Sequence, residues 1–76
     1  MNSPSAQLSR GSLAAKTGVN SETIRYYEKI GLMPQPLRSA GGHRVYGQSD
    51  LKRLSFIRRS RELGFTLREI RDLLEL

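Results

Sequence analysis

Residues 16–32 have the sequence KTGVNSETIRYYEKIGL, and the pattern in this stretch predicts a helix-turn-helix. A first helix is expected to end at Gly18, because glycine suits the left-handed position that follows a helix. Asn20 or Ser21 can cap a second helix, which we expect to end at Gly31. A short connection containing glycine between two short helices is typical of the helix-turn-helix motif.

The predicted second helix carries mostly polar side chains. Ile24 and Tyr27 fall on its core side, whereas Thr23, Arg25 and Tyr26 are available for contacts. A helix of this kind can lie in the major groove of DNA with its first turns against base edges. Arg25 can bind guanine through two hydrogen bonds, and Thr23 can contact a thymine methyl group or a phosphate. We expect the Tyr26 hydroxyl to donate to a phosphate oxygen.

The pattern changes after residue 33, where two closely spaced prolines forbid continuation of the helix. The segments 37–39 and 43–46 flank an Ala-Gly-Gly turn, which predicts a small β-hairpin. An isolated hairpin of this size is marginally stable, so we expect it to pack against the helices. In that position Arg38 and Arg44 could reach the DNA backbone or the neighbouring minor groove.

A third helix is predicted to open at residues 48–49 and to end at Gly64. Arg58 and Arg61 are three positions apart and share a face of this helix, so both could hold phosphates. Arg59 is expected to point away from them into solvent.

A fourth helix begins with Thr66 and Glu69, which have the spacing of a capping box. We expect its apolar stripe to be mainly core, and the alternative is that part of it binds a partner helix. The stripe has spacings of three and four and consists of Leu67, Ile70, Leu73 and Leu74.

The charge of the chain favours a nucleic-acid partner without proving one. The net charge is +6, and ten of the 13 cationic side chains are arginine. The planar fork of arginine suits phosphate oxygens and guanine edges. Solubility is the competing explanation of a basic excess. The cations concentrate in residues 49–64, whereas residues 65–76 are slightly acidic.

The composition argues against several classes of protein. With 76 residues the chain has room for one small domain, which we place at residues 8–76 after a flexible tail at 1–7. It has no cysteine, no secretory leader and no apolar run near the ~20 residues that span a bilayer. We therefore expect a cytoplasmic domain with no membrane partner and no cofactor of its own.

No catalytic constellation is visible in the sequence, so an enzyme is not expected. The single histidine, His43, lies in the predicted hairpin without the additional ligands that a metal site needs. We interpret it as a surface histidine or a phosphate contact.

The run from Gly18 to Leu32 resembles the recognition region of MerR-family transcription regulators. Gly42-His43-Arg44-Val45-Tyr46 is similar to the wing of that family, with its Arg-x-Tyr core, and residues 51–67 are similar to the helix that follows. The resemblance covers residues 8–75 in order. It implies a mainly α, winged helix-turn-helix of about four helices, with the hairpin wing between the second and third.

The resemblance also implies a function for the whole regulator in bacteria. Family members form homodimers on a pseudo-palindromic promoter site, where RNA polymerase binds, and they distort the spacer DNA in response to an effector. The dimerisation helix and the effector region lie beyond this chain. The cysteines of metal-sensing members usually lie there too, so the lack of cysteine does not bear on the effector. The DNA-contacting residues expected from the two arguments together are Thr23, Arg25, Tyr26, Tyr27, Arg38, His43, Arg44, Tyr46, Arg58 and Arg61.

Two other functions remain open at this point. A small architectural DNA-bending protein of the excisionase kind uses a similar winged helix without effector control. A protein-interaction module could instead use the basic face to bind an acidic partner, and then loss of Arg25 or Arg44 would leave DNA affinity unchanged.

Overall fold

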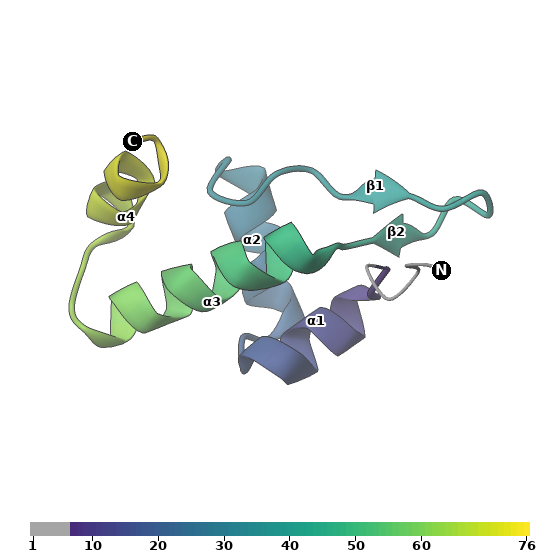
Figure 1. Cartoon of the computed structure of the whole chain (residues 1–76), viewed down its shortest axis with the longest axis horizontal. Coiled ribbons are helices and arrows are strands. Elements are labelled where there is room, and N and C mark those ends of the chain that lie inside the picture. Colours follow the sequence, from purple (N-terminus) through teal and green to yellow (C-terminus); the bar gives the residue numbers. More distant parts are fainter. Residues whose placement is uncertain (1–6) are drawn as a thin grey trace.

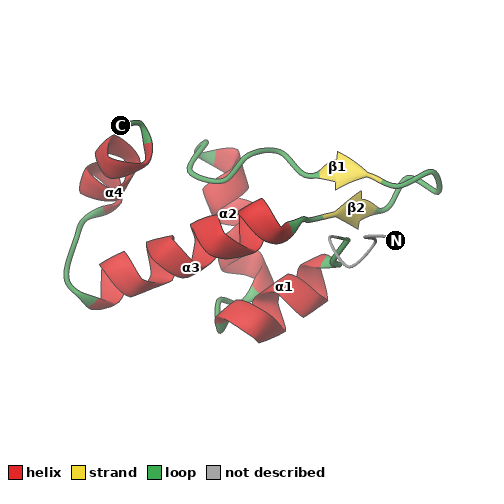
Figure 2. Ribbon diagram, viewed as in Figure 1, coloured by secondary structure: helices red, strands yellow, loops and turns green. Residues whose placement is uncertain are grey.

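The computed structural model describes residues 7–76 and confirms the winged helix-turn-helix (Figures 1 and 2). The predicted flexible tail falls, except for Gln7, outside the described residues. The elements in chain order are α1 (Arg10–Thr17), α2 (Ser21–Lys29), β1 (Leu37–Arg38), β2 (Arg44–Val45), α3 (Gln48–Glu62) and α4 (Leu67–Leu74).

The helix starts follow the side chains that cap them. Ser9 caps α1, and Asn20 caps α2 by accepting a hydrogen bond of 2.8 Å from the Thr23 amide. Thr66 and Glu69 form the predicted capping box of α4, in which each side chain accepts from the other residue's amide. These bonds satisfy amide groups that the first turn of a helix leaves without partners.

Helix α3 begins at Gln48, one of the two predicted positions. Its N-cap is Gly47, whose amide donates to the Asp50 carboxylate at 2.9 Å. The chain is held in an extended conformation up to Tyr46, whose backbone amide and carbonyl both pair with those of Leu8. Gly47 is therefore the first residue free to turn into the helix.

The wing is a two-stranded antiparallel hairpin between α2 and α3. Leu37 pairs with Val45 and Arg38 with Arg44, as predicted for segments 37–39 and 43–46. The pairing of Leu8 with Tyr46 attaches the base of the wing to the residues before α1, with backbone hydrogen bonds of 2.7 and 2.8 Å. The hairpin is thus held at its base by a backbone connection to the segment before α1, which the local pattern did not reveal.

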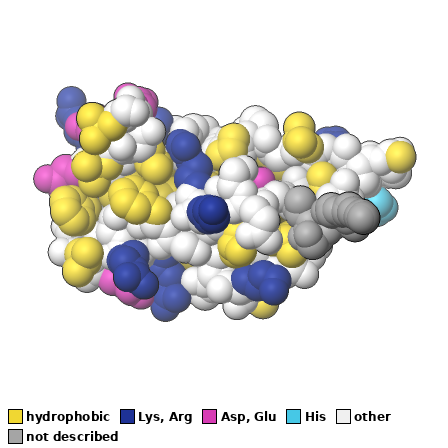
Figure 3. All heavy atoms as spheres, viewed as in Figure 1, with side chains coloured by type: hydrophobic (Ala, Val, Ile, Leu, Met, Phe, Trp, Pro, Cys, Tyr) yellow, Lys and Arg dark blue, Asp and Glu magenta, His cyan; other side chains and the backbone are white. Residues whose placement is uncertain are grey.

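A single core joins the helices and the base of the wing. Ile70 attaches α4 to this core, and the Arg71 guanidinium donates to the Ile30 carbonyl at 2.6 Å. Leu73 is 39% exposed, so the stripe of α4 is only partly core. Figure 3 shows apolar side chains gathered at the α4 end of the molecule. The buried apolar residues are Leu13, Val19, Ile24, Tyr27, Leu32, Met33, Tyr46, Leu54, Ile57 and Ile70.

Candidate nucleic-acid interface

Helix α2 presents one continuous polar face to solvent. Arg25, Tyr26 and Lys29 are exposed, and together with Glu22 they line a shallow hollow of about 390 Å³. Helical residues advance by about 100° each, so these four side chains occupy one arc of the helix surface. Arg25 makes no hydrogen bond or ion pair with residues 7–76, which leaves its guanidinium available to a ligand.

The opposite face of α2 holds the helix in the core. Ile24 is fully buried and Tyr27 is 8% exposed, with its ring centroid 6.2 Å from that of Tyr26. Thr23 is half-buried at one edge of the exposed arc. Of the two tyrosines predicted to contact phosphate, Tyr26 therefore faces solvent and Tyr27 is mainly a core residue.

The wing carries two exposed arginines and the single histidine. The Arg38 guanidinium donates to the Gly42 carbonyl at 2.9 Å and so stabilises the hairpin turn. Arg44 makes no polar side-chain contact with the described residues. His43 is exposed beside the turn, where Gly42 adopts φ +84°. Three of the four predicted wing residues are thus accessible, and Arg44 is the least engaged.

Tyr46 lies in the interior, unlike the other wing candidates. It is 2% exposed, and its hydroxyl donates to Glu28 Oε2 at 2.6 Å. Arg10 Nε donates to the same hydroxyl at 3.1 Å, and a second Arg10 nitrogen lies 3.4 Å from Glu28 Oε1. Burial, followed by the hydrogen bond to Glu28, raises the pKa of Tyr46 above its ordinary value of 10.0. Tyr46 is therefore engaged within the protein and is not available as a DNA contact.

Arg58 and Arg61 do not form one cluster, although they lie on the same helix. Arg58 donates to the Thr17 carbonyl at the end of α1, at 3.0 Å, and pairs with Glu62 at 3.2 Å. Arg61 instead donates to the Phe65 carbonyl at 2.8 Å, in the connection to α4. Arg58 thus bonds to a carbonyl left free at a helix end and Arg61 to a loop carbonyl, and helical spacing anticipates neither contact.

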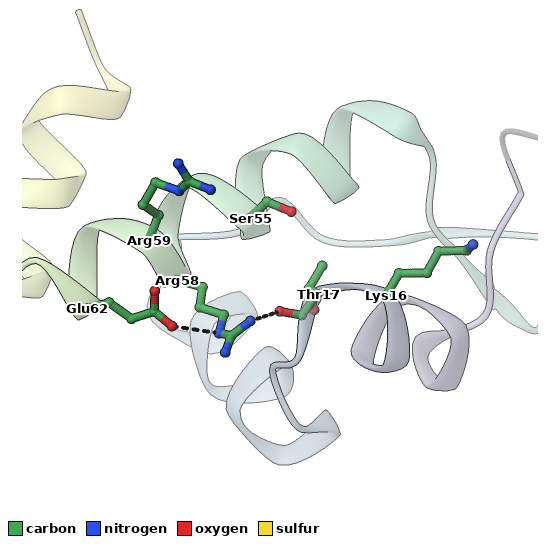
Figure 4. A pocket seen from close by; sticks show the side chains of 6 residues that line it. All are labelled: Lys16, Thr17, Ser55, Arg58, Arg59 and Glu62. Atoms are coloured by element: carbon green, nitrogen blue, oxygen red, sulfur yellow. Dashed lines mark hydrogen bonds and ion pairs between the residues drawn. The ribbon is translucent and has the colours of Figure 1, made fainter.

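A second hollow, of about 190 Å³, lies between the end of α1 and α3 (Figure 4). Arg59 also lines it, but its side chain is exposed and points away from that of Arg58, as expected. Lys16 also lines it and was missed by the sequence analysis, which placed no contact on α1. We call Lys16, Arg58 and Arg59 the cationic hollow; its other lining residues are Thr17, Ser55 and Glu62.

Sequence reasoning also missed Arg10 and Glu28, which support the base of the wing. A usable signal existed for Glu28, because it follows Ile24 by four positions and so falls on the buried side of α2. Glu28 is 7% exposed, and a buried carboxylate requires partners. No comparable local signal points to Arg10.

Two structural findings concern the described part of the chain only. Within residues 7–76, no three or more of His, Asp and Glu gather in a way that could hold a metal ion. None of the helices there has the length and apolar character needed to cross a membrane.

Comparison with known proteins identifies the family. Residues 8–76 match the family described as "MerR HTH family regulatory protein". The mercuric resistance operon regulatory protein of Bacillus cereus is 59% identical over 64 residues, which are 84% of this chain and 48% of that protein. The chain thus spans about half the length of the curated relatives it matches.

Solved structures agree with this relationship. The lead(II) complex of the regulator PbrR691 from Ralstonia metallidurans CH34 is 46% identical, with a TM-score of 0.80 over 90% of this chain and 53% of that one. HiNmlR, a MerR family regulator lacking the sensor domain and bound to promoter DNA, is 30% identical, with a TM-score of 0.82 over 91% of this chain and 52% of that one. The chain belongs to the MerR family of helix-turn-helix regulatory proteins.

Proposed function

We propose that this chain is the DNA-binding domain of a transcription regulator, with α2 as the helix that enters the major groove. The observation that carries this proposal is the exposed polar face of α2, in which Arg25 has no polar partner among the described residues. A guanidinium on such a face can bind the O6 and N7 atoms of guanine. The DNA-bound relative HiNmlR has the same fold over 91% of this chain.

The position of the wing supports the same surface. Glu28 bonds to Tyr46 at the base of the wing and lies about 60° around α2 from Arg25. Arg25 is therefore the exposed residue of α2 nearest the wing side, and Thr23 lies at the other edge. A helix in the major groove would place the wing, with Arg38, His43 and Arg44, against the adjoining backbone or minor groove.

Backbone contacts outside α2 complete the proposed interface. Arg58 is held at the end of α1 by its bond to Thr17 and pairs with Glu62 on its own helix, and Lys16 and Arg59 line the same hollow. We assign phosphate contacts to this cationic hollow, to the Tyr26 hydroxyl and to Arg61. Such contacts set the register of a protein on DNA without reading sequence.

At the level of the whole regulator, we propose a homodimer on a pseudo-palindromic site in a bacterial promoter. An effector would act through parts of the protein beyond this chain, and the dimer would control RNA polymerase by distorting the spacer DNA on the cytoplasmic nucleoid. Deformation of DNA has a sequence-dependent cost, so distortion contributes to site choice as well as to activation.

The test is an NMR titration of this chain with a duplex of about two helical turns, at low and moderate salt. Shifts that weaken with salt and gather on residues 21–29, on 38–46 and around Arg58 are the expected result. Arg68, which is exposed on α4 and has no polar contact within residues 7–76, serves as an internal reference that should not shift.

Two other outcomes would contradict the proposal. Absence of salt-sensitive shifts would contradict DNA binding by this surface. Shifts confined to Leu67, Ile70 and Leu74, and seen only with a protein partner, would support an interaction module.

A further inference from the structure

A buried polar cluster connects three separate elements at the base of the wing. Arg10 opens α1, Glu28 lies in the last turn of α2, and Tyr46 follows β2. We call these three residues the wing-base triad. The Tyr46 hydroxyl accepts from Arg10 Nε at 3.1 Å and donates to Glu28 Oε2 at 2.6 Å, and Arg10 also pairs with Glu28 at 3.4 Å.

The triad is buried enough for its bonds to constrain geometry. Tyr46 is 2% exposed, and the side chains of Glu28 and Arg10 are 7% and 18% exposed. A buried carboxylate without a partner is strongly unfavourable, so Glu28 holds both donors close. The short Tyr46–Glu28 bond also fixes the Tyr46 ring, and with it the backbone that leaves the wing.

Apart from the triad and the backbone pair between Leu8 and Tyr46, the wing has little to fix its direction. Its ladder consists of two residue pairs, Leu37 is 77% exposed, and Val45 is only half-buried. Tyr46 is the wing-side residue that belongs to the core. A hairpin with so few apolar contacts would pivot about its base, unless bonds at that base hold it.

We propose that the wing-base triad sets the angle of the wing relative to α2, and so decides which part of the DNA backbone Arg38 and Arg44 reach. Tyr46 is then a positioning residue that affects DNA recognition without touching DNA. The DNA consequence rests on the proposed function, whereas the orientation of the wing does not.

Tyr46→Phe tests the proposal because it removes one hydroxyl and keeps the buried ring. In the free protein, residual dipolar couplings of residues 37–45 measured against those of α2 should show a changed or more variable wing orientation. Arg10→Lys keeps the charge but loses the planar fork, and should produce the same change. Ile70→Val in α4, at the opposite end of the molecule from the wing (Figure 1), controls for a general loss of stability and should leave these couplings unchanged.

DNA affinity provides a second measurement, in which Tyr46→Phe is combined with the paired change Arg38→Ala and Arg44→Ala. On a duplex of about two helical turns, Tyr46→Phe should weaken binding about three- to tenfold, the range expected from one hydrogen bond. In the Arg44→Ala, Arg38→Ala background the same change should have little further effect, because the wing contacts through which Tyr46 acts are gone. Arg25→Ala should instead combine additively with Tyr46→Phe.

The outcomes separate the two ideas. Couplings in Tyr46→Phe and Arg10→Lys that match the wild type would overturn the role of the triad, as would losses of DNA affinity that add fully to those of the wing arginines. A wild-type chain that binds no DNA would overturn the proposed function and the DNA consequence with it. In that case the dipolar couplings would still decide whether the triad orients the wing.

Discussion

The Arg58 guanidinium on α3 donates a hydrogen bond of 3.0 Å to the backbone carbonyl of Thr17, which is the last residue of α1. The two residues are 41 positions apart, and their contact brings α3 against the turn of the helix-turn-helix. Gly18 follows Thr17 with φ +77°, and a Cβ atom built there would lie 2.6 Å from Arg58 Nη1. The turn therefore needs glycine both for its backbone conformation and for the approach of Arg58.

Gly18→Ala should destabilise the chain by about 2 kcal/mol, from left-handed backbone strain and the displaced Arg58 hydrogen bond. In an Arg58→Ala background the same change should cost only about 1 kcal/mol, because the strain alone remains. Urea unfolding of the wild type, the two single variants and the double variant measures this difference in unfolding free energy.

Gly11→Ala is the matched control on the same helix. Gly11 lies inside α1 without a positive φ, and its nearest neighbour to an added Cβ is Ser9 Oγ at 3.8 Å. Alanine should stabilise the chain there by roughly 0.5–1 kcal/mol. Equal costs of Gly18→Ala in both backgrounds would argue against the role of Arg58.

Arg25→Ala and Arg58→Ala should have different effects on DNA binding. Loss of Arg25 should lower discrimination between a selected site and random DNA by about 1–3 kcal/mol, since it removes a base contact. Loss of Arg58 should weaken both duplexes alike and reduce the salt dependence. Fluorescence anisotropy measures the affinity for each duplex and its salt dependence. Arg68→Ala is the control variant and is expected to change neither quantity. Equal losses on both duplexes for Arg25→Ala would contradict its assignment.

Tyr46 should make stability depend on pH in the alkaline range. Burial, then the hydrogen bond to Glu28, raises the pKa of the folded-state hydroxyl above 10.0, so the folded chain keeps this proton when the unfolded chain loses it. The contribution of Tyr46 is therefore fully present below its ordinary pKa and is lost as the pH rises above it. The gap in unfolding free energy between wild type and Tyr46→Phe should narrow above about pH 10. Urea unfolding across this range tests it, and a constant gap would count against a raised pKa.

Truncation of a buried leucine in α3 and of an exposed leucine just after it should have very different effects on stability. Leu54 is fully buried, so Leu54→Ala should cost about 2–5 kcal/mol through lost burial and a cavity. A domain of this size has a stability of only about 3–5 kcal/mol, and much of this variant should be unfolded. Leu63 is 72% exposed, and Leu63→Ala should change stability by less than about 0.5 kcal/mol. Circular dichroism during urea unfolding distinguishes them, and similar losses would contradict the placement of Leu63.

The helices, the hairpin and the exposed face of α2 follow from the local pattern of residues along the chain. Caps such as Asn20 and Thr66 bond to amides three residues away, and apolar spacing places Ile24 and Tyr27 on the buried side. Interactions of this range depend on neighbours in the chain, so local pattern is sufficient to predict them. The polar arc containing Arg25 followed from the same periodicity.

Which polar side chains are engaged within the protein depends instead on how distant segments pack together. Arg58 and Arg71 donate to carbonyls at the ends of α1 and α2, each across 41 residues, so a positive charge in the sequence is not always available to DNA. Tyr46 was predicted as a contact and is instead bonded to Glu28 and Arg10, which lie 18 and 36 residues away. Such partners are set by how the helices and the wing come together, because burial obliges each polar group to find whichever donor or acceptor the fold brings beside it.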